Sequence, residues 1–101
     1  MTIKTEQTGE TSVKLSLNGR LDAVTSQLLE KKLKKCGAEI TELTIDFLNL
    51  SYISSMGLRV LLHAQKTMKE RGRKLVIKNM SEPIREIFEI TGLISLMTLE
   101  E

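Results

Sequence analysis

Two adjacent serines, Ser54 and Ser55, stand where a strand-like apolar run gives way to an amphipathic helical pattern. A serine hydroxyl at such a position can cap the helix by accepting a backbone N–H. It can also carry a phosphate, because the free N–H groups and partial positive charge of a helix N-terminus stabilise an oxyanion. The residue types therefore leave two roles open at this turn, a structural cap and a phosphorylation site.

Neither serine has the companions of a catalytic nucleophile. The sole histidine, His63, is expected about two turns further along the helix, on its polar face. Phosphate-binding loops of the types GxxxxGK[ST] and GxGxxG are absent, and no cluster of Asp, Glu and His has metal-ligand spacing. We therefore expect no enzyme activity, no metal and no cofactor, and keep a phosphocarrier role for His63 only as a less favoured alternative.

Asp22 is the other polar residue in a suggestive place, between the end of a strand and the start of a helix. Its carboxylate can simply cap that helix. It can also lie beside the serine turn, because the carboxyl ends of neighbouring parallel strands share one edge of a sheet. The two roles are compatible, and both stay open.

The bulk properties describe one ordinary domain. The chain has 101 residues, of which 41% are hydrophobic and 28% charged, so it can bury one core without metal or disulfide support. A net charge of +2 is too small to indicate binding to nucleic acid or an anionic membrane. The single cysteine, Cys36, occupies an apolar helix position and is expected to be buried. No signal peptide or membrane-length apolar run occurs, so we expect a cytoplasmic protein without membrane insertion.

Hydrophobic periodicity predicts strands that alternate with helices. The first two strands, over residues 2–6 and 13–17, should form an antiparallel hairpin, with Asn18-Gly19-Arg20 breaking the second. Later strands are predicted from Leu43 into the serine turn, over 74–78 and over 96–99. Because helices connect these later strands, their pairing should be parallel, with right-handed crossovers. The prediction is a small α/β domain with a mixed sheet of four to five strands covered by helices, in an order that the sequence does not fix.

Three helices are predicted between these strands. The first spans residues 25–36, with Leu28, Leu29, Leu33 and Cys36 on its apolar side and Gly37 at its end. The second spans about residues 56–71 and is closed by Gly72. Its inward face is predicted to contain Gly57, Leu58, Val60, Leu61, Ala64 and Met68. The third lies between the cap Ser81 and Gly92, with Ile84, Ile87, Phe88 and Ile90 inside.

Three short motifs together resemble one family. Ile53-Ser54-Ser55-Met56-Gly57-Leu58, with the strand before it and the helix after it, is similar to the serine turn of STAS domains in bacterial anti-sigma factor antagonists. Gly19-Arg20-Leu21-Asp22 resembles the G-x-L-D element of that family, and Phe88-Glu89-Ile90-Thr91-Gly92-Leu93 resembles its F-x-x-x-G-L ending. The resemblance extends over residues 1–101 and implies a single STAS domain.

The resemblance implies a partner-switching regulator. In this family the unphosphorylated antagonist binds an anti-sigma factor, which is also a GHKL-type serine kinase using ATP and Mg²⁺, and a PP2C-type phosphatase reverses the phosphorylation. Aligned on the family pattern D-S-[ST]-G-[LI], the acceptor serine is Ser55, with Ser54 in place of the acid and as runner-up acceptor. The implied partner-binding residues are Asp22, Ser54, Ser55, Met56, Gly57 and Leu58. The alternative within the family is a non-switching scaffold subunit, for instance of a lipid-transport complex, in which Ser55 is only a cap.

Overall fold

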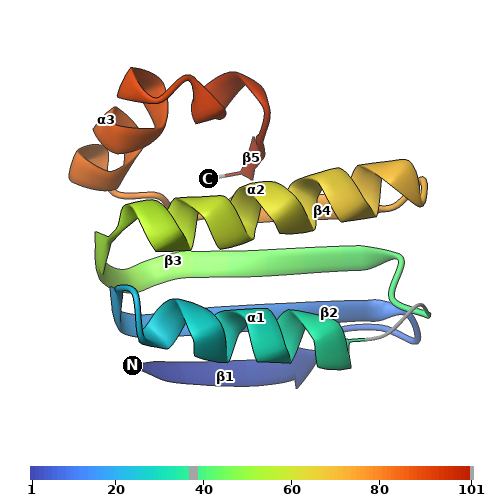
Figure 1. Cartoon of the computed structure of the whole chain (residues 1–101). Helices are drawn as coiled ribbons and strands as arrows, with labels where there is room; N and C mark the ends of the chain where they lie inside the picture. The colour runs from blue at the N-terminus through green and yellow to red at the C-terminus, as the bar shows by residue number, and fades with distance from the viewer. Residues whose placement is uncertain (37–38, 101) are drawn as a thin grey trace.

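Strands and helices alternate along the chain after an initial hairpin (Figure 1). The structure is a computed structural model, and it describes residues 1–36 and 39–100. In these residues the strands are β1 (Thr2–Gln7), β2 (Ser12–Leu21), β3 (Glu42–Ile53), β4 (Lys74–Lys78) and β5 (Thr98–Glu100). The helices are α1 (Thr25–Lys35), α2 (Ser55–Glu70), α3 (Glu82–Ile90) and the short 3-10 helix η1 (Leu93–Ser95). The predicted α/β class is confirmed, and Gly37, the predicted end of the first helix, lies outside the described residues.

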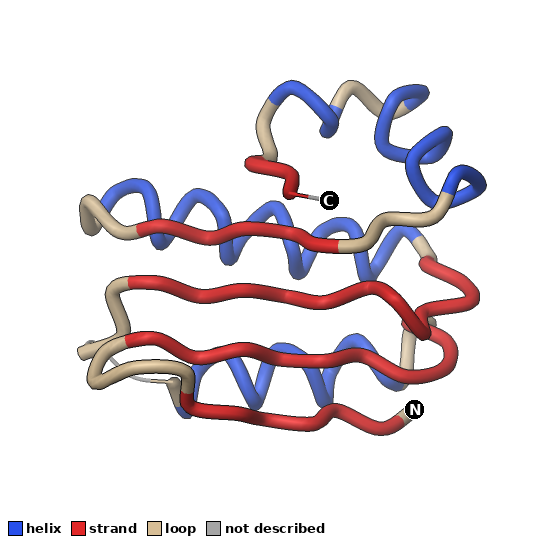
Figure 2. Tube along the Cα trace, turned by 180° about the vertical axis from the view of Figure 1, so that it is seen from behind, coloured by secondary structure: helices blue, strands red, loops and turns tan. Residues whose placement is uncertain are grey.

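The strand order in the sheet follows the order in the chain, β1-β2-β3-β4-β5. β1 and β2 pair antiparallel, whereas β2, β3, β4 and β5 pair parallel, as predicted from the helical connections. Because each parallel strand is added on the same side of the previous one, crossovers of one hand place α1 and α2 on the same face. Figure 1 shows both helices in front of the sheet, and Figure 2 shows the opposite face without a covering helix.

The core lies between the sheet and the helices. Alternate residues of β2 point toward it, with Leu15 and Leu17 almost fully buried, and α2 contributes Leu61. From α3, Phe88 packs against Phe47 of β3 with ring centroids 6.3 Å apart. The predicted inward face of α2 is confirmed, except that Met68 is only half-buried.

The prediction that Asn18-Gly19-Arg20 breaks the second strand is wrong. β2 continues to Leu21, and its pairing with β3 shifts register between Ser16 and Asn18 and again between Gly19 and Arg20. At each shift β3 contains one extra residue, which is the geometry of a bulge. Gly19 has a φ of +107°, a conformation that glycine adopts readily. The bulged pair therefore runs on until Leu21 and Ile53 lie side by side at its end.

Three predicted apolar positions and the predicted start of the last strand need correction. Ile90 is 84% exposed rather than inside, because α3 directs Ile84 and Phe88 to the core and Ile90 lies on the other side of the helix. Leu96 is exposed after η1, and the last strand begins only at Thr98. Leu28 is also exposed, and Cys36 at the end of α1 is half-buried rather than buried.

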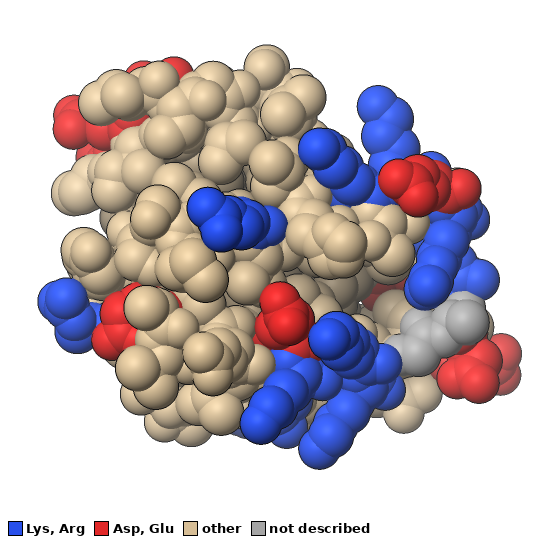
Figure 3. Space-filling view, in the orientation of Figure 1, with Lys and Arg blue, Asp and Glu red and all other residues tan. Residues whose placement is uncertain are grey.

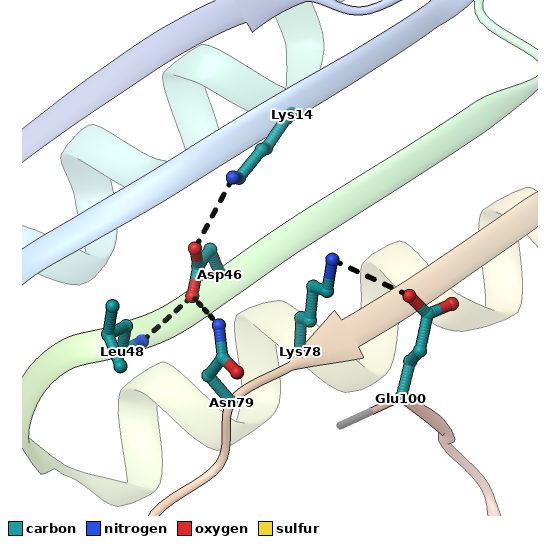
Figure 4. A network of polar contacts seen from close by, with 6 residues as sticks. All are labelled: Lys14, Asp46, Leu48, Lys78, Asn79 and Glu100. Carbon is teal, nitrogen blue, oxygen red and sulfur yellow. Dashed lines mark hydrogen bonds and ion pairs between the residues drawn. The ribbon is translucent and has the colours of Figure 1, made fainter.

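A polar network on the sheet face opposite the helices joins β2, β3 and the residue after β4 (Figure 4). Asp46 Oδ1 accepts hydrogen bonds from the Leu48 N–H at 2.9 Å and from Asn79 Nδ2 at 3.0 Å. Lys14 Nζ lies 3.5 Å from Asp46 Oδ2. Burial by itself would raise the pKa of this carboxyl, but these hydrogen bonds and the Lys14 charge together lower its pKa below the ordinary 3.8.

We expect Asp46→Asn to lower the free energy of unfolding by about 1–2 kcal/mol at neutral pH. The substitution removes the negative charge that Lys14, the Leu48 N–H and Asn79 contact. A lowered folded-state pKa stabilises the protein above the unfolded-state pKa, and this contribution is lost as the pH falls through the folded-state value. Urea unfolding measured from pH 7 down to pH 2 should therefore show that the free energy of unfolding falls less with acid in the variant than in the unsubstituted chain. The control is Glu100→Gln, which breaks the exposed pair with Lys78 (3.6 Å) and should cost under about 0.5 kcal/mol. Equal losses in the two variants would contradict this role for Asp46.

Candidate functional site

Ser54 is the N-cap of α2. Its backbone is extended (φ −96°, ψ 171°), and its Oγ accepts a hydrogen bond from the Gly57 N–H at 3.3 Å. Its carbonyl oxygen accepts the Leu58 N–H at 3.0 Å, the first bond of the helix. Of the two roles that the sequence left open, Ser54 therefore fills the structural one.

Ser55 is the first residue of α2, and its side chain is exposed. It lies where the N–H groups of the first turn and the positive end of the helix dipole are available to an added anion. A modifying enzyme can therefore reach this hydroxyl without disturbing the hydrophobic core. The two neighbouring serines therefore have different roles in the structure. Ser54 caps the helix, and Ser55 leaves its hydroxyl exposed.

Gly57 holds the start of α2 close to the ends of β2 and β3. An ideal Cβ on Gly57 would lie 2.8 Å from Leu21 Cγ and Cδ2, a distance that Cβ atoms essentially never adopt. It would also lie 3.0 Å from Ile53 Cγ1, which is closer than nine in ten Cβ contacts. Leu21 is fully buried and Ile53 nearly so, so neither can move away freely. A larger residue at this position would therefore force Leu21 or Ile53 to shift, or α2 to begin further from the sheet.

Asp22 caps α1. Its Oδ1 accepts hydrogen bonds from the Thr25 N–H at 2.9 Å and the Val24 N–H at 3.0 Å, and Thr25 Oγ1 lies 3.0 Å away. The pKa of this carboxyl is lowered, chiefly by the Thr25 backbone N–H and then by the Thr25 hydroxyl. The structural role considered for Asp22 is therefore present in the structure.

The turns that contain Asp22 and Ser54 are neighbours, as their positions after parallel strands predicted. The Ser54 N–H donates to the Leu21 carbonyl at 2.8 Å, immediately before Asp22. In register, Leu21 pairs with Ile53, so both turns leave the sheet at the same edge. This edge carries the starts of α1 and α2 side by side (Figure 1).

The residues around Ser55 differ in exposure, and this decides which of them a partner can contact. Met56 is 38% exposed and can contact a partner, whereas Leu58 is 8% exposed and Gly57 is buried. Leu58 and Gly57 therefore position the turn, and Met56 and Ser55 form its accessible surface. The sequence pattern did not single out Val24, which is 72% exposed in the neighbouring turn. Its place two residues after the G-x-L-D element was the available signal.

Arg20 and Tyr52 add a second exposed feature to this edge. They pair across β2 and β3, and the Arg20 guanidinium lies 4.2 Å from the centre of the Tyr52 ring, a cation–π contact. Sequence reasoning treated Arg20 as part of a break, so it did not foresee this pair. The pair borders the end of β3 that leads into Ser54.

His63 lies two turns into α2 with an exposed side chain, away from the first turn that contains Ser55. Within residues 1–36 and 39–100, no three side chains of the types His, Cys, Asp and Glu are grouped so that they could hold a metal ion. In the same residues, no helix is both long and apolar enough to span a membrane.

Known proteins are similar to this chain both in sequence and in fold. The STAS domain family model matches residues 2–101. The anti-sigma-B factor antagonist of Bacillus subtilis (strain 168) is 31% identical over 84 residues, which are 83% of this chain and 77% of the relative. The protein of the same name from Staphylococcus epidermidis is 33% identical over 88 residues, 86% of this chain and 82% of the relative.

Solved structures agree with this match at the level of the fold. The anti-sigma factor antagonist SpoIIAA in its unphosphorylated form has a TM-score of 0.84 at 22% identity, covering 99% of this chain and 89% of the other. The phosphorylated form of the Bacillus cell fate determinant SpoIIAA has a TM-score of 0.79 at 20% identity, covering 99% and 92%. The chain belongs to the STAS domain family.

We expect Gly57→Ala to destabilise the fold although alanine favours helices. The helix preference would stabilise by up to about 1 kcal/mol, whereas overpacking against Leu21 and Ile53 costs about 1–3 kcal/mol. Denaturant unfolding should therefore show a net loss of roughly 1–2 kcal/mol. Gly9→Ala is the control, because its new Cβ would meet Ser12 at an ordinary 3.4 Å, and its stability should change by less than about 0.5 kcal/mol. A stabilised Gly57→Ala would show that the helix start is not so closely packed.

Proposed function

We propose that this chain is an anti-sigma factor antagonist whose binding is switched off by phosphorylation of Ser55. The observation that carries the proposal is the exposed Ser55 hydroxyl on the first turn of α2, at the position of the acceptor in the family pattern. Relatives above 30% identity with the name anti-sigma-B factor antagonist support it. The existence of SpoIIAA in phosphorylated and unphosphorylated forms supports a switch of this kind.

The proposed partner is an anti-sigma factor that is also a GHKL-type serine kinase. It transfers the γ-phosphoryl group of ATP to Ser55 Oγ, which loses its proton, and ADP leaves. ATP and Mg²⁺ are held by the kinase and not by this chain. A PP2C-type phosphatase then hydrolyses the phosphoserine with water, releasing inorganic phosphate and restoring the hydroxyl.

The helix start explains how a phosphate can change binding and leave the fold intact. About −1.5 to −2 charges would be added beside free N–H groups and the positive end of the dipole, where an anion is tolerated. The same charge would lie in the middle of the accessible surface formed by Ser55 and Met56. Charging a group at the centre of an interface commonly costs about 2 kcal/mol or more, roughly a thirtyfold loss of affinity.

Ser54 in place of the family acid is compatible with this mechanism. Serine and aspartate are both good N-caps, so the cap to the Gly57 N–H is kept. A neutral cap also places no negative charge next to a phosphate on Ser55. The substitution therefore preserves the local structure on which the proposed switch depends.

The experiment is a binding titration of Ser55→Asp and Ser55→Ala against the cognate anti-sigma factor. We expect Ser55→Asp to bind at least about thirtyfold more weakly, and Ser55→Ala to bind normally and to resist inhibition by kinase and ATP. Ser95→Asp, which places the same charge on an exposed serine of η1, is the matched control and should bind normally.

Phosphopeptide mapping after incubation with kinase and ATP completes the test. Phosphate should be found on Ser55 and be absent from the Ser55→Ala variant, which separates this mechanism from the scaffold alternative and from a phosphorylated His63. Phosphate on Ser54, or a Ser55→Asp variant that binds as well as the unsubstituted chain, would overturn the proposal.

A further inference from the structure

A hollow of about 410 Å³ lies between α1 and α2, at the end of the helices remote from Ser55. Apolar side chains form most of its wall: Leu33 of α1, Ile40 in the loop before β3, Leu43 of β3, and Val60, Ala64 and Met68 of α2. Leu33, Ile40 and Met68 are only half-buried, so part of this apolar surface is open to the hollow. Its size falls within the range of small-molecule sites, roughly 300–1,000 Å³.

Two short side chains, Ala64 and Thr67, are among the residues of α2 that line the hollow, together with Val60, His63 and Met68. The proposed switch uses residues 54–58 and Asp22, so none of the residues around the hollow is needed for that mechanism. An unfilled apolar surface next to a well-packed core is where a ligand can gain free energy by burial.

The rim of the hollow is charged, with a surplus of positive groups. Lys34 and Glu30 lie on it and pair with each other at 3.6 Å between Nζ and Oε1. Arg71 also lies on the rim, and no carboxylate in the described part of the chain forms an ion pair with it. In Figure 3, Lys and Arg side chains gather toward the right-hand end of this face, where the two helices end. Arg71 therefore offers a planar donor fork beside an apolar space.

We propose that the hollow binds a free medium-chain aliphatic carboxylate, with its chain between the helices and its carboxylate on Arg71. Guanidinium and carboxylate form paired hydrogen bonds that an alcohol cannot reproduce. A methylene takes about the space of one water molecule, roughly 30 Å³ in a liquid, so the hollow has room for a chain of about ten carbons. The Glu30 carboxylate is already paired with Lys34, which leaves Arg71 as the cation for the ligand.

The test is a titration of the whole chain with decanoate below its micelle concentration, followed by calorimetry and by ¹H–¹⁵N spectra. We expect saturable one-to-one binding with a Kd on the order of 0.1 mM, given the size of the ligand. Shifts should concentrate on Leu33, Val60, Ala64 and Met68. Decanol, which has the same chain without the charge, should bind about five- to tenfold more weakly.

Two pairs of variants test whether decanoate binds in this hollow. Arg71→Gln should weaken decanoate binding about five- to tenfold and leave decanol unaffected. Lys69→Gln removes the same charge from the same end of α2 but does not line the hollow, and should bind decanoate normally. Thr67→Met fills the hollow and should abolish binding, whereas Lys66→Met introduces methionine at an exposed neighbour and should not.

Non-saturable binding, shifts that map outside the hollow, or equal affinity for decanoate and decanol would each overturn the proposal. Because the readout is ligand binding to the isolated chain, it is independent of the anti-sigma factor. A failure here would therefore leave the proposed function untouched, and a failure of the Ser55 experiments would leave this site untouched.

Discussion

The close approach of α2 to the end of β2 is the constraint on which the rest of the site depends. The Ser54 N–H reaches the Leu21 carbonyl at 2.8 Å, and Gly57 lies so close to the Leu21 side chain that an added Cβ would force one of them to move. Two bulges in β3 bring Ile53 into register with Leu21, so this contact forms at the sheet edge. A buried leucine thereby fixes where the helix begins, and through it which residue of the turn faces solvent.

Because this contact fixes where α2 begins, the hydroxyls of Ser54 and Ser55 have different roles. Ser54 Oγ accepts the Gly57 N–H and caps the helix, while Ser55 occupies the first helical position with its side chain exposed. On the neighbouring strand, Asp22 caps α1 in the same manner, so both helix starts are held by short polar side chains at one edge. The result is a rigid surface on which a single exposed group can be modified without releasing either cap.

The parts of the fold that a local sequence pattern determines could be predicted from the sequence. Alternation in β2 and the helical connections were enough to predict the hairpin, the parallel pairing and the α/β class. The break at Gly19 was wrong because the continuation of β2 depends on a tertiary contact, its bulged pairing with β3. The inward placement of Ile90 was wrong because Ile90 lies on the side of α3 opposite Ile84 and Phe88. Strand order has no local signal. Residue types alone could not separate the roles of Ser54 and Ser55 either, because a cap and an acceptor need the same side chain, and it was the family pattern that favoured Ser55 as the acceptor.

The most direct measurement compares ¹H–¹⁵N spectra and thermal unfolding of the chain before and after complete phosphorylation of Ser55. We expect shift changes confined to the first turn of α2 and the adjoining Asp22 turn. The Tm should fall no more than about 4 °C below that of the unmodified chain, since an anion at a helix start is typically stabilising by about 0.3–1 kcal/mol. Changes that spread through β2 and β3, or a Tm lower by about 10 °C or more, would contradict the claim that the exposed hydroxyl can be modified while the scaffold stays intact.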